Sequence, residues 1–227
     1  MLEIGPGMGA LTWGLLQRVR SLDVIEIDRD LARSLQEDPR AASGLRVHVE
    51  DALHTDFGRL RGCGGPLRIV GNLPYNISTP LLFRLLSQRA AIADMHFMLQ
   101  REVVDRIVAA PGTSAYGRLT VMLAPRVSAA RLLDVGPGAF RPAPKVASSV
   151  VRLTVLDALP DWARAPLYGE VVMAAFGQRR KTLRNSLSRY LSAPQIETLG
   201  IDPGVRAETL TPVQFGALAQ AAAAVLH

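Results

Sequence analysis

Short apolar runs alternate with longer amphipathic stretches through the first half of the chain. The runs have the composition of buried strands and lie at Met1–Ile4, Leu22–Ile27, Leu45–Glu50, Leu67–Gly71 and Met95–Leu99. Helices are predicted between and after them, at Ala10–Val19, Arg29–Gln36, from Pro80 onward and at Glu102–Val108. Strands that alternate with helices predict a parallel sheet with helices on both faces.

The pattern changes after Leu119. Two further strands are predicted at Val127–Leu133 and Ser149–Leu156, and a loop rich in Gly and Pro joins them. Such a pair is suited to form an antiparallel edge on an otherwise parallel sheet.

The rest of the chain has a helical pattern. Helices are predicted at Leu167–Leu191 and Pro212–Leu226, and one apolar stripe in the first is formed by Phe176, Leu183, Leu187 and Leu191. We therefore expect an α/β domain at residues 1–156 and a small C-terminal α-helical domain at residues 157–227.

Charge is the compositional feature that adds most to this picture. The 227 residues carry a formal net charge of +6, and the pI is ≈ 10.2. Basic residues outnumber acids seven to one over Arg106–Leu156 and five to none over Gly177–Leu191. Clusters of this kind favour a polyanion as partner, although a solvated helix face would carry them as well.

Several classes of protein are excluded. Cys63 is the only cysteine, and the four histidines are not spaced as metal ligands, so neither a disulfide framework nor a metal site is expected. The start of the chain does not resemble a signal peptide, and no apolar stretch approaches the roughly 20 residues of a membrane span. We expect a cytoplasmic protein with no membrane contact.

A glycine-rich turn follows the first predicted strand, in the sequence Glu3-Ile4-Gly5-Pro6-Gly7-Met8-Gly9. Glycines here let the backbone approach a ligand, and the following helix start offers free N–H groups. The spacing does not fit the dinucleotide fingerprint, because Ala10 stands where the last glycine would be. A tight turn without a ligand is the alternative interpretation.

Acidic residues at the next two strand ends favour a ligand. Glu26 is placed to accept the two hydroxyls of a ribose, and Asp51 is suited to accept from an adenine amine. Together with the turn that contains Gly5 and Gly7, they predict a cofactor that contains adenosine. Glu3 disfavours a pyrophosphate and suits the cationic amino acid end of S-adenosylmethionine.

The fourth strand end has the most specific sequence, Asn72-Leu73-Pro74-Tyr75-Asn76. The Asn72 amide oxygen and the Leu73 carbonyl are suited to accept the two N–H bonds of an exocyclic adenine amine. Pro74 would fix the turn, and Tyr75 would stack on a flipped-out base. Phe140 could form a second stacking wall or serve as a buried loop anchor. A plain Asn-Pro loop with a core Tyr is the alternative.

Five segments resemble the KsgA-type ribosomal RNA adenine dimethyltransferases. They are EIGPGMGALT (3–12), VIEIDRD (24–30), GNLPYNISTPL (71–81), FRPAPKV (140–146) and FGQRRKTLRNSL (176–187). The first two motifs occur in many methyltransferases. The Asn-Leu-Pro-Tyr motif narrows this class to enzymes that methylate the amino group of adenine. The run Gln178–Asn185 is typical of the small-subunit branch of the family.

The resemblance implies a class I (Rossmann-like) methyltransferase sheet of seven strands plus a helical domain. It implies dimethylation of two adjacent adenosines in a hairpin near the 3′ end of small-subunit (16S) rRNA, with the immature small subunit as partner. We expect the protein to act as a monomer. The implied S-adenosylmethionine site comprises Glu3, Gly5, Gly7, Glu26, Asp51, Ala52 and Asn72. The implied RNA-binding residues are Arg141, Lys145, Arg179, Arg180, Lys181 and Arg184.

The start of the chain departs from the family pattern. Family members carry an upstream Lys-x-x-x-Gln-x-Phe-Leu segment, whereas Met1 here lies inside the first predicted strand. We expect the genomic reading frame to continue upstream and encode such a segment.

Three alternative functions remain open at this stage. The first is an antibiotic-resistance methyltransferase for large-subunit rRNA, which the run Gln178–Asn185 disfavours. The second is a ribosome assembly factor whose catalysis is secondary, and the basic clusters fit it equally well. The weakest is a nicotinamide dehydrogenase.

Overall fold

The computed structural model describes residues 1–74, 77–140, 146–178 and 180–226. The chain divides into two compact units. The first unit comprises Met1–Val104 and Ala130–Val155, and the second comprises Asp105–Ala129 and Leu156–His227. The sequence pattern placed one boundary near Leu156, whereas in the structure the segment Asp105–Ala129 also belongs to the second unit.

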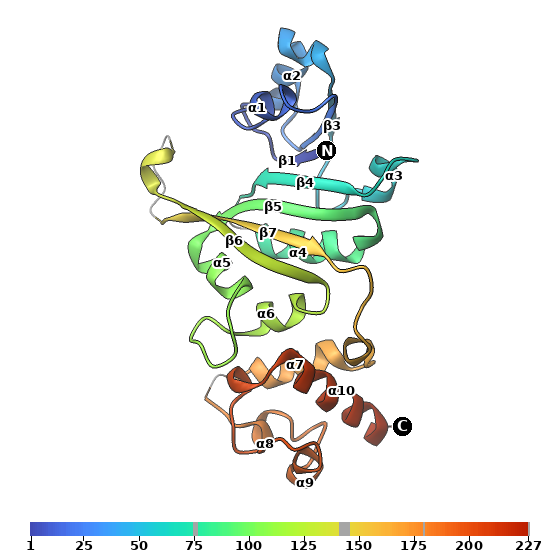
Figure 1. The fold of residues 1–227 in the computed structure, drawn as a ribbon, viewed down its shortest axis with the longest axis vertical. Helices are drawn as coiled ribbons and strands as arrows, with labels where there is room; N and C mark the ends of the chain where they lie inside the picture. Colours follow the sequence, from blue (N-terminus) through green and yellow to red (C-terminus); the bar gives the residue numbers. More distant parts are fainter. Residues whose placement is uncertain (75–76, 141–145, 179, 227) are drawn as a thin grey trace. The chain divides into compact units, whose positions relative to one another are not determined.

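The first unit is built on one mixed sheet (Figure 1). Within the described residues it has seven strands, in the order β3-β2-β1-β4-β5-β7-β6. Their bounds are β1 Leu2–Ile4, β2 Leu22–Glu26, β3 Leu45–Val49, β4 Leu67–Asn72, β5 Ile92–Gln100, β6 Val127–Val135 and β7 Ser148–Val155. Strands β1 to β5 pair in parallel, and β7 pairs with β5 antiparallel. The predicted parallel sheet with an antiparallel edge is confirmed.

The central strands are buried on both faces. Leu2, Val24 and Ile69 are fully buried, which explains why these strands appear in the sequence as continuous apolar runs rather than alternating ones. The backbones of β1 and β4 approach closely at Gly71, where a Cβ atom would lie 2.7 Å from the carbonyl oxygen of Ile4. Only glycine fits this position without a shift of the backbone.

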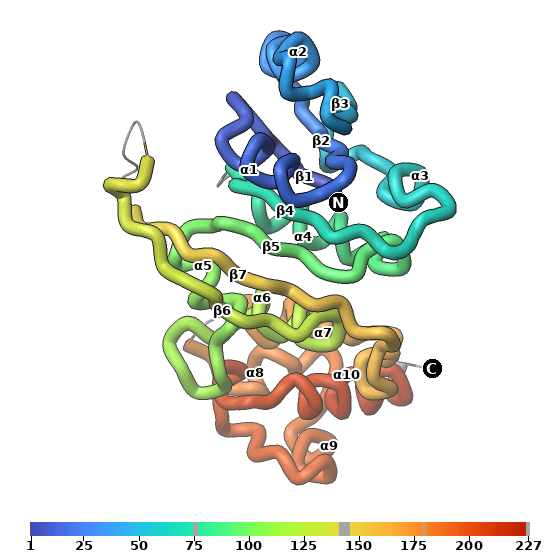
Figure 2. The backbone as a smooth tube through the Cα atoms, turned by 45° about the horizontal axis from the view of Figure 1, so that its top comes forward, coloured from blue at the N-terminus to red at the C-terminus, as the bar shows by residue number. Residues whose placement is uncertain are grey.

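Helices cover both faces of this sheet. They are α1 Thr12–Leu16, α2 Arg29–Glu37, α3 Phe57–Arg61 and α4 Ser78–Ser87. Figures 1 and 2 show α1 and α4 on opposite faces, as right-handed crossovers from β1 and β4 in opposite directions require. Helix α1 is shorter than the predicted Ala10–Val19, and Gly14 within it disfavours a longer helix.

The second unit has its own hydrophobic core, which includes Tyr116, Tyr168 and Phe215. Its helices are α6 Arg118–Leu123, α7 Tyr168–Phe176, α8 Leu183–Ser186, α9 Ala193–Glu197 and α10 Pro212–Leu226, and α5 Arg101–Ile107 crosses the division between the units. The prediction for Pro212–Leu226 is confirmed. Tyr168 and Tyr116 donate their hydroxyls to backbone carbonyls inside this core.

The predicted continuous helix Leu167–Leu191 is wrong. Helix α7 ends at Phe176, and the backbone at Thr182 pairs with Arg206 instead of continuing the helix. Leu183 N–H then donates to the Val205 carbonyl. Leu183, Leu187 and Leu191 of the apolar stripe are buried nevertheless, because the short helix α8 and the turn after it keep their spacing of four residues, and Phe176 is half-buried against the same core.

Candidate active site

The glycine turn after β1 combines three left-handed glycines. Gly5, Gly7 and Gly9 have φ values of 67°, 56° and 82°, a region that other residues rarely adopt. A Cβ atom at Gly9 would lie 2.5 Å from Trp13 Nε1, whereas a Cβ at Gly5 or Gly7 would meet nothing within 4 Å. Gly9 is therefore required for packing, and Gly5 and Gly7 leave open space beside the backbone.

Glu26 holds this turn against the end of β2. Its carboxylate is buried and accepts hydrogen bonds from the N–H groups of Gly7 at 3.1 Å and Asp28 at 3.0 Å. Each carboxylate oxygen has a further lone pair to offer. Glu26 thus shapes the turn in addition to the ribose contact predicted from the sequence.

Glu3 is a buried carboxylate whose hydrogen-bonding capacity is incompletely used. It is 2% exposed, and within the described chain neither its Oε2 nor the nearby Thr12 Oγ1 has a hydrogen-bond partner. Burial, with a smaller contribution from the charge of Glu26, raises the pKa of Glu3 to about 7. An unpaired buried carboxylate oxygen is costly, so this position fits a cationic ligand that would pair with it. The sequence analysis assigned no role to Thr12, although Thr12 ends the motif EIGPGMGALT.

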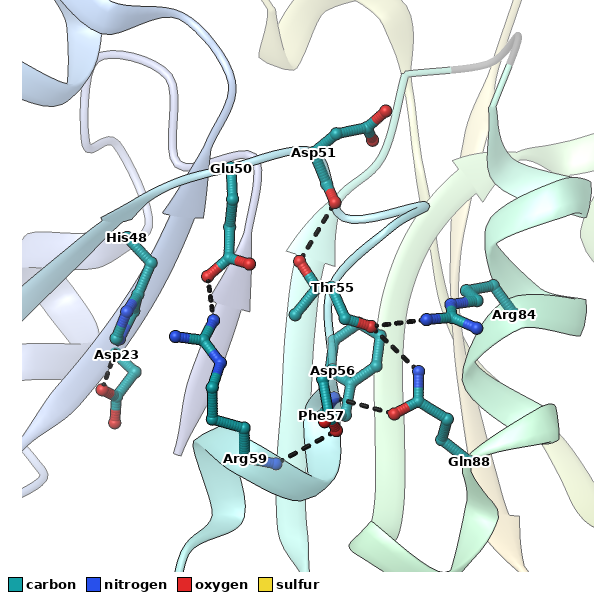
Figure 3. A network of polar contacts seen from close by, with 10 residues as sticks. All are labelled: Asp23, His48, Glu50, Asp51, Thr55, Asp56, Phe57, Arg59, Arg84 and Gln88. Carbon is teal, nitrogen blue, oxygen red and sulfur yellow. Dashed lines mark hydrogen bonds and ion pairs between the residues drawn. The ribbon is translucent and has the colours of Figure 1, made fainter.

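Asp51 begins the loop that follows β3. Its Oδ1 accepts from the Leu53 N–H at 2.8 Å, and its Oδ2 lies 2.9 Å from His54 Nδ1. The next residue, Ala52, is buried. Figure 3 shows this loop and the side chains of Arg84 and Gln88 that reach it from α4 and its end. No sequence signal indicated Arg84 or Gln88, because both lie far from Asp51 along the chain.

The fourth strand end presents Asn72 on the surface. Leu73 beside it is buried, and its N–H donates to the Met98 carbonyl at 3.3 Å. Pro74 is exposed, and its carbonyl accepts from Ile77 N–H at 3.3 Å. Tyr75 lies outside the described residues. Phe140, the other predicted stacking residue, is half-buried.

The sheet brings the predicted cofactor residues to one edge. Glu3 on β1 lies in register between Val24 on β2 and Val70 on β4. Since these strands are parallel and adjacent, their carboxyl ends meet at the same edge, where open α/β sheets bind ligands. In the part of the chain that the structure describes, no group of His, Cys, Asp or Glu is arranged to hold a metal ion.

The predicted RNA-binding residues are only partly described. Arg180, Lys181 and Arg184 are exposed. Only Arg184 lies on a helix, α8, so the three do not lie on the one continuous helix that the sequence pattern predicted. Arg141, Lys145 and Arg179 lie outside the described residues.

This strand order, with a glycine turn and acids at successive strand ends, defines a class I methyltransferase fold. The protein family described as "Ribosomal RNA adenine dimethylase" matches residues 1–224. The chain therefore belongs to the ribosomal RNA adenine dimethylase family.

Individual relatives agree with this assignment. Proteins named "Ribosomal RNA small subunit methyltransferase A" are 55% identical in Aromatoleum aromaticum (96% of this chain, 81% of the relative) and 51% identical in Methylobacillus flagellatus (99% and 87%). A dimethyladenosine transferase from Plasmodium falciparum is similar in structure, with a TM-score of 0.78 at 25% identity over 96% of this chain and 87% of that one. The 23S rRNA methyltransferase ErmE has a TM-score of 0.73 at 28% identity over 97% and 89%. Among the described residues, no helix is both long and apolar enough to cross a membrane.

Proposed function

We propose that this protein dimethylates the N6 amines of two adjacent adenosines near the 3′ end of small-subunit rRNA, with S-adenosylmethionine as methyl donor. The observation that carries the proposal is the identity of 55% and 51% to relatives named as small-subunit enzymes. The likeness to the large-subunit enzyme ErmE is much weaker, at 28%.

Three acidic side chains and the backbone at two glycines fit the cofactor. Bound S-adenosylmethionine supplies an electrophilic methyl group on a sulfonium. The unpaired Oε2 of Glu3 suits the cationic end of such a molecule, and Glu26 has lone pairs left for the ribose hydroxyls. Asp51 would accept from the adenine amine, and the open backbone at Gly5 and Gly7 gives the cofactor room.

The target amine would be held by the fourth strand end. The Asn72 amide oxygen and the Leu73 carbonyl accept hydrogen bonds from the two N–H groups of this amine. These two hydrogen bonds draw the nitrogen lone pair out of conjugation with the adenine ring. Methyl transfer makes the N6 amine cationic, and this cationic product loses its proton easily. No strong general base is therefore needed. Pro74 shapes the turn, and Tyr75 and Phe140 would stack on the extruded base, as in other enzymes that act on flipped nucleotides.

The partner is the immature small ribosomal subunit, bound by the protein as a monomer in the cytoplasm. The net charge of +6 and the exposed Arg180, Lys181 and Arg184 support an RNA partner.

Mass spectrometry of rRNA fragments tests the proposal. Unmethylated small subunits and large subunits are incubated separately with the protein and S-adenosylmethionine. We expect a gain of two methyl groups on each of two adjacent adenosines in the small-subunit fragment only. Methylation of the large-subunit rRNA instead would support the resistance-enzyme alternative. Binding of small subunits without any methyl transfer would support the assembly-factor alternative.

A further inference from the structure

The loop that carries Asp51 is held in place by side chains from another part of the first unit. Residues 51–56, between β3 and α3, form no helix or strand. Figure 3 shows Arg84 of α4 and Gln88, the residue that caps the C-terminus of α4, pointing toward Thr55 and Phe57 in this region. The hydrogen bonds across this contact span about thirty positions of the chain, so they are tertiary rather than local.

Gln88 binds the loop with both ends of its amide. Its Oε1 accepts from the Phe57 N–H at 2.8 Å, and its Nε2 donates to the Thr55 carbonyl at 2.9 Å. The Phe57 N–H is one of the donors at the start of α3 that have no acceptor within the helix. Arg84 Nη2 donates to the same Thr55 carbonyl at 3.0 Å. A side-chain amide is suited to this position because it offers a donor and an acceptor together.

Thr55 connects these hydrogen bonds to Asp51. The Thr55 side chain is buried, and its Oγ1 donates to the Asp51 carbonyl at 3.0 Å. By contrast, the Asp51 carboxylate contacts Leu53 and His54, which belong to the same loop. Those contacts orient the carboxylate within the loop, whereas Gln88 fixes the loop against the rest of the unit.

Helix α4 is a firm support for this contact. Leu81 and Leu85 on it are fully buried in the core, so the helix has little freedom to shift. The helix starts at Ser78, a few residues after Asn72, and its far end carries Arg84 and Gln88. Helix α4 therefore connects the strand end at Asn72, proposed to hold the target amine, to the loop that contains Asp51, proposed to bind the cofactor's adenine.

We infer that Gln88, assisted by Arg84, is a positioning residue that places Asp51 for recognition of the cofactor's adenine. The inference deepens the proposed function and rests on it, because it requires that Asp51 accepts from the adenine amine. Gln88 itself does not contact the cofactor; it acts through Thr55.

Calorimetric binding of S-adenosylmethionine tests this role. The set comprises the wild type, Gln88→Ala, Asp51→Ala and the double variant, measured well below their melting temperatures. We expect Gln88→Ala to weaken binding about tenfold, or about 1.4 kcal/mol. S-adenosylhomocysteine, which has the same adenosine, should lose affinity by the same factor. The double variant should bind within about twofold of Asp51→Ala alone, because both changes remove the same contact.

Two further variants make the test specific. Gln88→Glu keeps an acceptor for the Phe57 N–H and loses the donor to Thr55, so it should also weaken binding, and it takes the place of Gln88→Ala should that variant not fold. Arg61→Ala is the matched control, since Arg61, like Gln88, makes two hydrogen bonds to the backbone: it donates to the carbonyls of Gly64 and Ala90 at 3.2 Å each. The control should bind S-adenosylmethionine as the wild type does.

The outcomes separate the inference from the proposed function. Weakened binding by Asp51→Ala with wild-type binding by both Gln88 variants would overturn the inference alone. Fully additive losses in the double variant would also overturn it, because Gln88 would then act by a route other than Asp51. A wild type that does not bind S-adenosylmethionine, or an Asp51→Ala variant that binds as tightly as wild type, would refute the proposed role of Asp51 and the inference with it.

Discussion

Replacing Glu3 with Gln should stabilise the protein at pH 8 and weaken its binding of S-adenosylmethionine. Burial raises the pKa of Glu3 to about 7 from an ordinary value of 4.5. Between pH 4.5 and pH 7, Glu3 is protonated in the folded protein but ionised in the unfolded chain. The free energy of unfolding therefore falls as the pH rises through this range. Linkage over this window gives a loss of about 2 to 3 kcal/mol between pH 5 and pH 8. The Gln variant does not titrate and escapes this loss.

Urea unfolding of both proteins at several pH values measures the effect. The quantity to follow is the difference in unfolding free energy between Glu3→Gln and wild type, which cancels the titration of all other groups. This difference should shift in favour of the variant by about 2 to 3 kcal/mol from pH 5 to pH 8. A difference that stays constant with pH would refute the reasoning, because Glu3 would then titrate alike in both states.

Cofactor binding should respond in the opposite sense. A cationic ligand favours the ionised carboxylate, so a site with a pKa near 7 should bind about tenfold more weakly at pH 6 than at pH 8. The amine of S-adenosylmethionine also titrates in this region, so the ratio of wild-type to Glu3→Gln affinity is the quantity to plot. A ratio independent of pH would show that Glu3 does not face the positive charge.

Four further predictions concern other residues. Glu26→Ala should weaken S-adenosylmethionine binding roughly ten- to a hundredfold by calorimetry, since it removes a charge-assisted acceptor; unchanged affinity would contradict the ribose assignment. Asn72→Ala should lower methyl transfer by about 10²-fold while small-subunit binding stays nearly intact, and turnover within twofold of wild type would exclude its role. Reversing the charges of Lys181 and Arg184 together should flatten the log–log salt dependence of subunit binding by roughly one to two units; an unchanged slope would leave them as solvated surface. Gly71→Ala should cost about 1 to 3 kcal/mol in urea unfolding, because the new Cβ would overlap the Ile4 carbonyl; wild-type stability would show that β1 and β4 can separate freely.

The sheet could be predicted from the sequence because its central strands are buried on both faces. Runs such as Leu67–Gly71 contain little besides apolar residues, and turn residues or acids end them. The short helices α3, α6 and α9 were missed, since five or six residues give too few turns to establish a helical period. The predicted helix Leu167–Leu191 failed because leucines spaced by four also suit a short helix followed by a turn, and the competing backbone partner at Val205 is invisible to local patterns.

The site residues that lie at the ends of strands could be predicted from the sequence. Glu3, Glu26, Asp51 and Asn72 each stand at or just beyond the last residues of a strand, so the topology alone brings them together. The supporting contacts could not be predicted in this way. Gln88 lies 31 positions from Phe57, and nothing in the chain around either residue marks them as partners. The pairing of Glu26 with the Gly7 N–H is a similar case.

The strand order also sets a sequence of events during synthesis. Strand β1 lies between β2 and β4, yet β4 is made last of the three, after β2 and β3. At translation rates of about 5 to 20 residues per second, β1 waits on the order of several seconds for its second neighbour. During that interval the nascent chain presents one unpaired apolar edge of β1, the kind of edge that pairs with foreign strands. Substitutions that weaken the β1–β2 pairing should therefore reduce the yield of folded protein in cells more strongly than their effect on equilibrium stability would suggest.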